Sequence, residues 1–102
     1  NAKDALLKLE DEKRLLFINA YTKDNFVIIE IKDNAEGIKE EIIGRIFEPY
    51  FTTKHQSQGT GMGLYMSQNI VKNYLNGTLD VYNEDYKYKG LAYTGAKFII
   101  II

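Results

Sequence analysis

Gly59-Thr60-Gly61-Met62-Gly63-Leu64 carries glycine at three alternate positions and leads directly into a segment with helical spacing. From residue 64 to residue 75, apolar side chains recur every three or four positions, which is typical of an amphipathic helix. The glycines therefore lie at a predicted helix N-terminus, where unpaired backbone N–H groups and the helix dipole favour an anion. We expect phosphate groups there; a plain turn before a helix is the alternative.

The spacing of these glycines excludes two common nucleotide loops. A dinucleotide-binding turn needs G-x-G-x-x-G after a strand, but the third glycine position falls on Leu64. A P-loop ends in Gly-Lys-Ser or Gly-Lys-Thr, and the sequence contains neither tripeptide.

Composition is compatible with one compact site. With 102 residues, 45% of them hydrophobic, the chain can bury a single modest core. A net charge of −1 without a basic block argues against nucleic acid as the main partner. The absence of cysteine suits a reducing compartment, and no apolar run in the sequence is long enough to cross a bilayer.

The order of patterns along the chain is mixed. We expect strands at 15–21, 26–31, 78–82 and 96–102, helices at 1–9, 39–47 and 64–75, and a hairpin turn at 22–25. Residues 33–37 are expected to form a loop, 48–58 an irregular polar segment and 83–93 a polar hairpin. Strands whose apolar sides are covered by helices on one face give an α+β two-layer sandwich.

Four segments together resemble the ATP-binding catalytic domain of bacterial sensor histidine kinases, within the superfamily that also holds type II topoisomerases, chaperone ATPases and mismatch-repair ATPases. They resemble, in order, the end of the N box, the G1 box, the F box and the G2 box: Asn1-Ala2-Lys3-Asp4-Ala5, Asp33-Asn34-Ala35-Glu36-Gly37-Ile38, Ile46-Phe47-Glu48-Pro49-Tyr50-Phe51-Thr52-Thr53-Lys54 and Gly59-Thr60-Gly61-Met62-Gly63-Leu64. The resemblance implies a Bergerat-type ATP-binding fold with a mixed sheet. It covers residues 1–102 as a single domain that lacks its N-terminal helix and strand, since the first helical pattern starts without a cap.

The resemblance implies an adenine site at the G1 box. Asp33 accepts a hydrogen bond from the exocyclic amine of adenine, and because a carboxylate only accepts, it selects adenine over guanine at that edge. Gly37 lets the backbone pass close to the base, and Ile38 belongs to the same site. Ala35 stands where the family usually has glycine, which costs about 1 kcal/mol if that position needs a positive φ.

A phosphate and metal site is implied at the other boxes. Asn1 offers its side-chain oxygen to Mg²⁺, a cation usually shared with substrate phosphates. Asp4, one turn further on, orients a magnesium-bound water or is simply solvated. Five further residues are expected around the phosphates: Gly59, Thr60, Gly61, Gly63 and Leu64. Lys54 is either a phosphate partner or a solvated side chain. Phe47 and Phe51 are expected to anchor the F-box segment on the core.

The implied activity is that of a protein histidine kinase. The chain holds ATP and Mg²⁺, and its γ-phosphate passes to a histidine on a separate dimerisation domain of the parent kinase and then, indirectly, to a response regulator. The general base and the phosphoacceptor lie outside the chain, since His55 has no helical pattern around it and is expected at the surface. Alone, the chain is not expected to autophosphorylate, although it can self-associate through an exposed apolar face.

Two other classes of function remain open at this point. One is a nucleotide-binding or interaction module that kept the fold and lost activity, suggested by Ala35 and by the short first helix. The other is an ATPase or serine kinase of the same superfamily, which the F-box segment disfavours. A cytoplasmic location is expected, with membrane anchoring of the parent protein left open.

Overall fold

The computed structural model describes residues 2–7, 13–52 and 61–102. Several residues singled out from the sequence lie outside these ranges, and their roles stay predictions: Asn1, Lys54, His55, Gly59 and Thr60.

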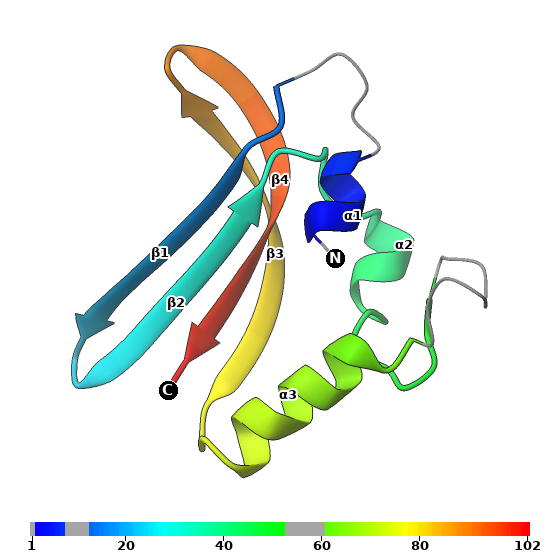
Figure 1. Cartoon of the computed structure of the whole chain (residues 1–102), viewed down its shortest axis with the longest axis vertical. Helices are drawn as coiled ribbons and strands as arrows, with labels where there is room; N and C mark the ends of the chain where they lie inside the picture. The colour runs from blue at the N-terminus through cyan, green and yellow to red at the C-terminus, as the bar shows by residue number, and fades with distance from the viewer. Residues whose placement is uncertain (1, 8–12, 53–60) are drawn as a thin grey trace.

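A four-stranded sheet forms one layer of the molecule (Figure 1). Its strands are β1 (Leu16–Lys23), β2 (Phe26–Asp33), β3 (Thr78–Tyr88) and β4 (Leu91–Ile101), arranged in the order β1-β2-β4-β3. All three neighbouring pairs are antiparallel. The α+β class is thus confirmed, but the sheet is not mixed over the described residues, because two hairpins supply its strands and meet through β2 and β4.

Both hairpins close through two-residue turns. Asp24 and Asn25 have φ values of 51° and 68°, and Lys89 and Gly90 have φ values of 50° and 81°. Two consecutive positive φ angles are the mark of the type I′ turn, which matches the twist of the flanking strands. The turn expected at 22–25 is therefore confirmed and is tighter than predicted.

The segment 83–93 forms a hairpin, as the sequence analysis expected, but it is not separate from the strands at 78–82 and 96–102: it is the far half of one long hairpin that they share. β3 and β4 each contain 11 residues, paired from Thr78–Ile101 to Tyr88–Leu91. Tyrosines at alternate positions in this segment favour strand over loop. The tip of this hairpin bends away from the helices (Figure 1).

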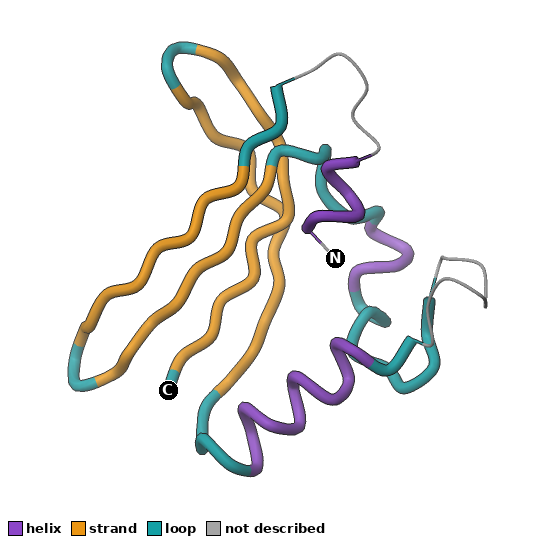
Figure 2. Tube along the Cα trace, viewed as in Figure 1, coloured by secondary structure: helices purple, strands orange, loops and turns teal. Residues whose placement is uncertain are grey.

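The three helices of the described residues lie on one side of the sheet (Figure 2). α1 (Ala2–Leu7) lies against β2, and α3 (Gly63–Asn73) lies against β3. α2 (Glu40–Ile43) is shorter than the predicted helix at 39–47, because Gly44 ends it and the chain continues through turns in which Arg45 N–H donates to Ile42 O and Glu48 N–H to Arg45 O. None of the helices in the described ranges is long and apolar enough to cross a membrane.

The core lies between α3 and the sheet. Successive side chains of a strand alternate between the two faces, and the register puts Ile31, Phe98 and Val81 side by side on the helix face. Val71, Leu79 and Ala96 are the buried apolar residues of the described chain. Asp33 and Asn34, at 4% and 3% exposure, are buried as deeply as this apolar core.

The opposite, open face of the sheet carries a row of paired charges. Lys97 Nζ lies 3.2 Å from Glu30 Oε1 and 3.1 Å from Glu84 Oε2, and Lys32 Nζ lies 3.7 Å from Glu84 Oε1. Burial alone lowers the pKa of Lys97, but hydrogen bonds to Glu84 and Glu30 outweigh it, and the net pKa is raised. The ammonium group therefore stays charged and bridges β4 to both of its neighbours.

The sheet edges meet at one end of this open face. β1 and β3 are the two outer strands, yet the Phe17 ring on β1 lies 5.9 Å from the Tyr86 ring and 5.0 Å from the Tyr88 ring on β3, both edge to face. The β3–β4 hairpin thus curls across β2 and reaches the other edge, and this contact packs aromatic rings in their preferred geometry.

We predict that Gly95→Ala destabilises the fold. A Cβ at Gly95 would overlap the carbonyl oxygen of Asp33 on the neighbouring strand, and a clash in a packed interior typically costs about 1–3 kcal/mol. Urea denaturation measures the free energy of unfolding. Gly44→Ala is the matched control, because a Cβ there meets nothing within 4 Å; equal stability of the two variants would contradict the predicted close approach.

Candidate functional site

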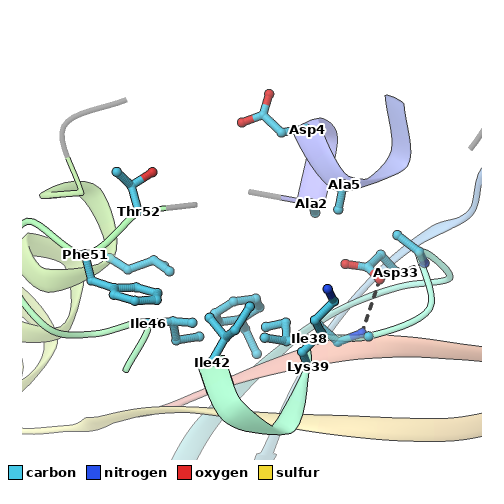
Figure 3. A pocket seen from close by; sticks show the side chains of 15 residues that line it. Ala2, Asp4, Ala5, Asp33, Ile38, Lys39, Ile42, Ile46, Phe51 and Thr52 are labelled. Carbon is cyan, nitrogen blue, oxygen red and sulfur yellow. Dashed lines mark hydrogen bonds between the residues drawn. The ribbon is translucent and has the colours of Figure 1, made fainter. Parts of the chain in front are cut away.

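A cavity of about 460 Å³ opens between the helices and the end of the sheet (Figure 3). Its walls come from α1, the end of β2, the loop after β2, α2, the segment before α3, the start of α3, and β4. Its lining residues are Ala2, Asp4, Ala5, Asp33, Ala35, Gly37, Ile38, Lys39, Ile42, Ile46, Phe51, Thr52, Leu64, Ala96 and Phe98. Most of the lining is apolar, with a few polar groups, which is the composition expected of a small-molecule site.

Asp33 is the acidic group at the base of this cavity. It ends β2, and its Oδ1 accepts hydrogen bonds from the backbone N–H of Ala35 at 3.0 Å and of Ala96 at 3.2 Å. Figure 3 shows its carboxylate facing into the cavity. Both of these hydrogen bonds end on Oδ1, and the second carboxylate oxygen faces the cavity as an acceptor.

In the loop after Asp33, the positive φ angles fall on Glu36 and Gly37 and not on Ala35. Ala35 keeps an ordinary φ, whereas Glu36 has a φ of 70° and Gly37 a φ of 80°. The backbone N–H of Glu36 donates to Thr94 O at 2.9 Å, which ties the loop to β4. The replacement of glycine by Ala35 therefore carries no backbone cost, and the strain falls on Glu36 instead.

Asn83 on β3 clamps the other end of the loop. Its Nδ2 donates to Ile38 O at 2.7 Å, and its Oδ1 accepts from Ile38 N–H at 2.8 Å. Gly37 lies directly against it, since a Cβ there would come within 2.7 Å of Asn83 Oδ1. The amide of Asn83 thereby satisfies both backbone groups of Ile38 and holds the loop at the cavity wall.

Asn34 likewise uses its side-chain amide to hold backbone groups, here in the segment that leads into β1. Its Nδ2 donates to Lys13 O at 2.6 Å, and its Oδ1 accepts from Leu15 N–H at 2.9 Å. These bonds fix the chain where it enters β1. Neither Asn34 nor Asn83 was predicted as a site residue, because a single asparagine in a sequence is as typical of a turn as of a clamp.

The described half of the G2 box lies where the sequence analysis expects it. Gly63 is the first residue of α3, and Met62 before it makes no side-chain cap, so the first N–H groups of the helix have no capping side chain. Gly61 has a φ of 72°, and a Cβ on it would overlap the backbone of Tyr50. Leu64 lines the cavity, but Gly61 and Gly63 are not among the residues that line it.

The aromatic residues of the F box divide between two roles. Phe47 packs edge to face on Phe98 with the ring centroids 6.4 Å apart, which confirms its prediction as an anchor on the core. Phe51 instead lines the cavity, and the Arg45 guanidinium lies 4.5 Å from its ring centroid. Phe51 therefore belongs to the wall of the site as well as to the packing of the segment.

The α1 wall of the cavity is made by Ala2, Asp4 and Ala5 (Figure 3). Small side chains at two of these positions leave space for a ligand, and Asp4 adds a carboxylate. Within the described ranges no group of three or more His, Cys, Asp or Glu side chains is placed to hold a metal ion. Magnesium bound through phosphates needs only one or two protein oxygens.

Four of the predicted nucleotide-binding residues, from two segments that lie far apart in the sequence, line this one cavity: Asp33, Gly37, Ile38 and Leu64. The family model described as "Histidine kinase-, DNA gyrase B-, and HSP90-like ATPase" matches residues 1–102. The chain belongs to this family. The family is described as an ATPase family, which supports ATP binding by this chain.

Curated relatives of this chain are sensor kinases. It is 39% identical over 87 residues to the two-component sensor PprA of Pseudomonas aeruginosa. The matched region covers 82% of this chain and 9% of PprA. It is 39% identical over 70 residues to sporulation kinase A of Bacillus subtilis, covering 69% of this chain and 11% of that kinase. The chain thus spans only about a tenth of the length of these relatives.

Solved structures with the same fold are histidine kinase catalytic domains. A nucleotide-free structure of the catalytic domain of ThkA superposes with a TM-score of 0.73 at 25% identity, covering 99% of this chain and 60% of that chain. A second nucleotide-free form gives a TM-score of 0.65 at 27% identity, with 87% of this chain and 52% of that chain covered. The antiparallel sheet with helices on one face is therefore the fold of such catalytic domains.

We predict that Asn83→Ala loosens the loop at the cavity wall. The variant loses two hydrogen bonds to Ile38, each worth about 1 kcal/mol net, and leaves both backbone groups of Ile38 to find water. Hydrogen exchange of the Ile38 amide should quicken several-fold, with a modest loss of stability. Asn19→Ala, on the exposed surface of β1, should leave that amide unchanged; a similar effect of both variants would contradict the clamp.

Proposed function

We propose that this chain is the ATP-binding catalytic part of a two-component sensor histidine kinase. The observation that carries the proposal is a buried carboxylate, Asp33, held by backbone amides at the base of a cavity in a chain of this ATPase family. In the parent protein, the γ-phosphate of ATP passes to a histidine of a separate dimerisation domain. A response-regulator aspartate then receives it.

The adenine end of the proposed site is the Asp33 end of the cavity. The carboxylate accepts a hydrogen bond from the exocyclic amine, and a bond to a charged group is worth about 1.5–3 kcal/mol. Gly37 and Ile38 form the backbone wall beside the base, and Leu64 contributes apolar surface from α3. Guanine presents a carbonyl oxygen at the same edge, which a carboxylate repels.

The phosphate end is proposed at the start of α3. The helix N-terminus attracts anions through its N–H groups and its dipole, and Gly61 and Gly63 bring the backbone close. Gly59, Thr60 and Lys54 complete this end of the site in the proposal. Asn1 is the proposed protein ligand of Mg²⁺, and Asp4 at the cavity wall orients one of its waters.

Phosphoryl transfer requires little covalent chemistry from the protein. Catalysis comes chiefly from positioning and from neutralising charge on the phosphates, and Mg²⁺ supplies much of that neutralisation when bound. The residues of this chain bind the adenine base at one end and the phosphates at the helix N-terminus, and so fix the position of the nucleotide. The phosphoacceptor histidine comes from the dimerisation domain, and we place this reaction in the cytoplasm, where ATP and response regulators occur.

An inactive binding module is the less favoured function. It was suggested partly by Ala35, but the ordinary φ of Ala35 removes the expected strain from the G1 loop. An ATPase or serine kinase of the same superfamily is also less favoured, because the curated relatives compared above are sensor kinases.

We predict that Asp33→Asn abolishes adenine-selective binding. Asparagine keeps one oxygen to accept from Ala35 and Ala96, but it replaces the acceptor that faces the cavity with an NH₂ donor. Calorimetric titration with a non-hydrolysable ATP analogue and Mg²⁺ should show at least about a tenfold loss of affinity, equivalent to about 1.4 kcal/mol.

The control for this experiment is Asp80→Asn, which makes the same chemical change at an exposed position of β3. It should bind the analogue like the unmodified chain. A folded chain that does not bind the analogue at all, or that binds adenine and guanine nucleotides equally, would contradict the proposed function.

A further inference from the structure

Beyond Asn83, the far half of the β3–β4 hairpin has no role in the site as proposed so far, yet the side chain of Tyr86 reaches the central residue of that site. The Tyr86 hydroxyl donates a hydrogen bond of 2.6 Å to the backbone carbonyl oxygen of Asp33. The two residues are 53 positions apart in the sequence. This contact comes from the open face of the sheet, whereas the cavity lies on the helix face.

Tyr86 is itself held on several sides. Lys32 Nζ lies 4.0 Å from the centroid of its ring, and the rings of Phe17 and Tyr93 lie 5.9 Å and 6.0 Å away. Glu84 in turn pairs with Lys32. Contacts between a cation and a ring face, and between rings edge to face, are each favourable, so the hydroxyl is directed rather than free to rotate away.

Asp33 needs this support on its β4 side, because the β2–β4 ladder stops short of it, although β1 still pairs it with Leu16. The pairing of β2 with β4 ends at Lys32–Lys97, one residue before Asp33. Beyond that point, Gly95 lets the Asp33 carbonyl pack directly against the β4 backbone. Tyr86 supplies a donor to that carbonyl, while Ala35 and Ala96 supply donors to the carboxylate.

We propose that Tyr86 is a positioning residue for adenine discrimination, acting through the main chain of Asp33. The inference rests on the proposed function, in which Asp33 reads the exocyclic amine. With its backbone fixed from behind and Oδ1 fixed from the side, the carboxylate presents its second oxygen at one place. Burial, followed by the nearby charges of Asp33 and Glu84, raises the pKa of Tyr86, so the hydroxyl remains a donor at physiological pH.

Tyr86→Phe tests this role, because it removes only the hydroxyl and keeps the ring in the aromatic cluster. We expect the affinity for ATP with Mg²⁺ to fall about 5-fold, the equivalent of one hydrogen bond of about 1 kcal/mol. Affinity for inosine triphosphate, whose base carries a carbonyl oxygen in place of the exocyclic amine, should not fall. Tyr88→Phe, in the same cluster against Phe17, is the matched control and should change neither affinity.

A second readout needs no nucleotide and separates this inference from the proposed function. Hydrogen exchange of the Ala35 and Ala96 amides, which donate to Asp33 Oδ1, should quicken several-fold in Tyr86→Phe and not in Tyr88→Phe. Failure of the unmodified chain to bind ATP would refute the proposed function, while the exchange rates would still report the hold on Asp33. Unchanged exchange, or an equal loss of affinity for ATP and inosine triphosphate, would overturn the positioning role.

Discussion

Two hydrogen bonds to one buried oxygen, Asp33 Oδ1, hold the site together. The donors are the amides of Ala35 in the loop and Ala96 on β4, so a single carboxylate joins the end of β2 to both. A charged group at 4% exposure is tolerated only when it is hydrogen-bonded. The structural need to satisfy one oxygen therefore fixes the direction of the other, and the stability of this corner and the base recognition proposed for it depend on the same residue.

The rest of the corner is built to keep the loop 33–38 from moving relative to the sheet. Asn83 holds Ile38, Thr94 O accepts from Glu36, and Tyr86 holds the Asp33 carbonyl. All three come from the β3–β4 hairpin. Its length and its curl toward β1 thus have a mechanical consequence at the cavity, because a shorter hairpin would end before Tyr86 and leave the Asp33 carbonyl without this donor.

The sequence predicts the elements well where the signal is local and less well where it depends on tertiary contact. The turn at Asp24 and Asn25 and the start of α3 at Gly63 follow from turn chemistry and from periodicity. A hairpin was expected at 83–93, but its continuity with β3 and β4 was not, because the polar residues there give no strand signal until the partner strand and Phe17 are present. Asp33 could be found from its motif, but Asn83 and Tyr86 could not, since their importance lies in contacts with residues 45 and 53 positions away.

The two ends of the cavity differ in how they are held, which suits the chemistry proposed for them. The Asp33 end is fixed by hydrogen bonds between strands and loop, so its shape exists before any ligand arrives. At the other end α3 begins at Gly63 after Met62, which makes no side-chain cap, and a helix N-terminus attracts anions through its dipole and its N–H groups. A base can therefore be selected by geometry alone, while the phosphates contribute through charge. In the proposed function, this division would leave the γ-phosphate at the end of the site away from Asp33, where an acceptor from another domain could approach without disturbing the adenine contacts.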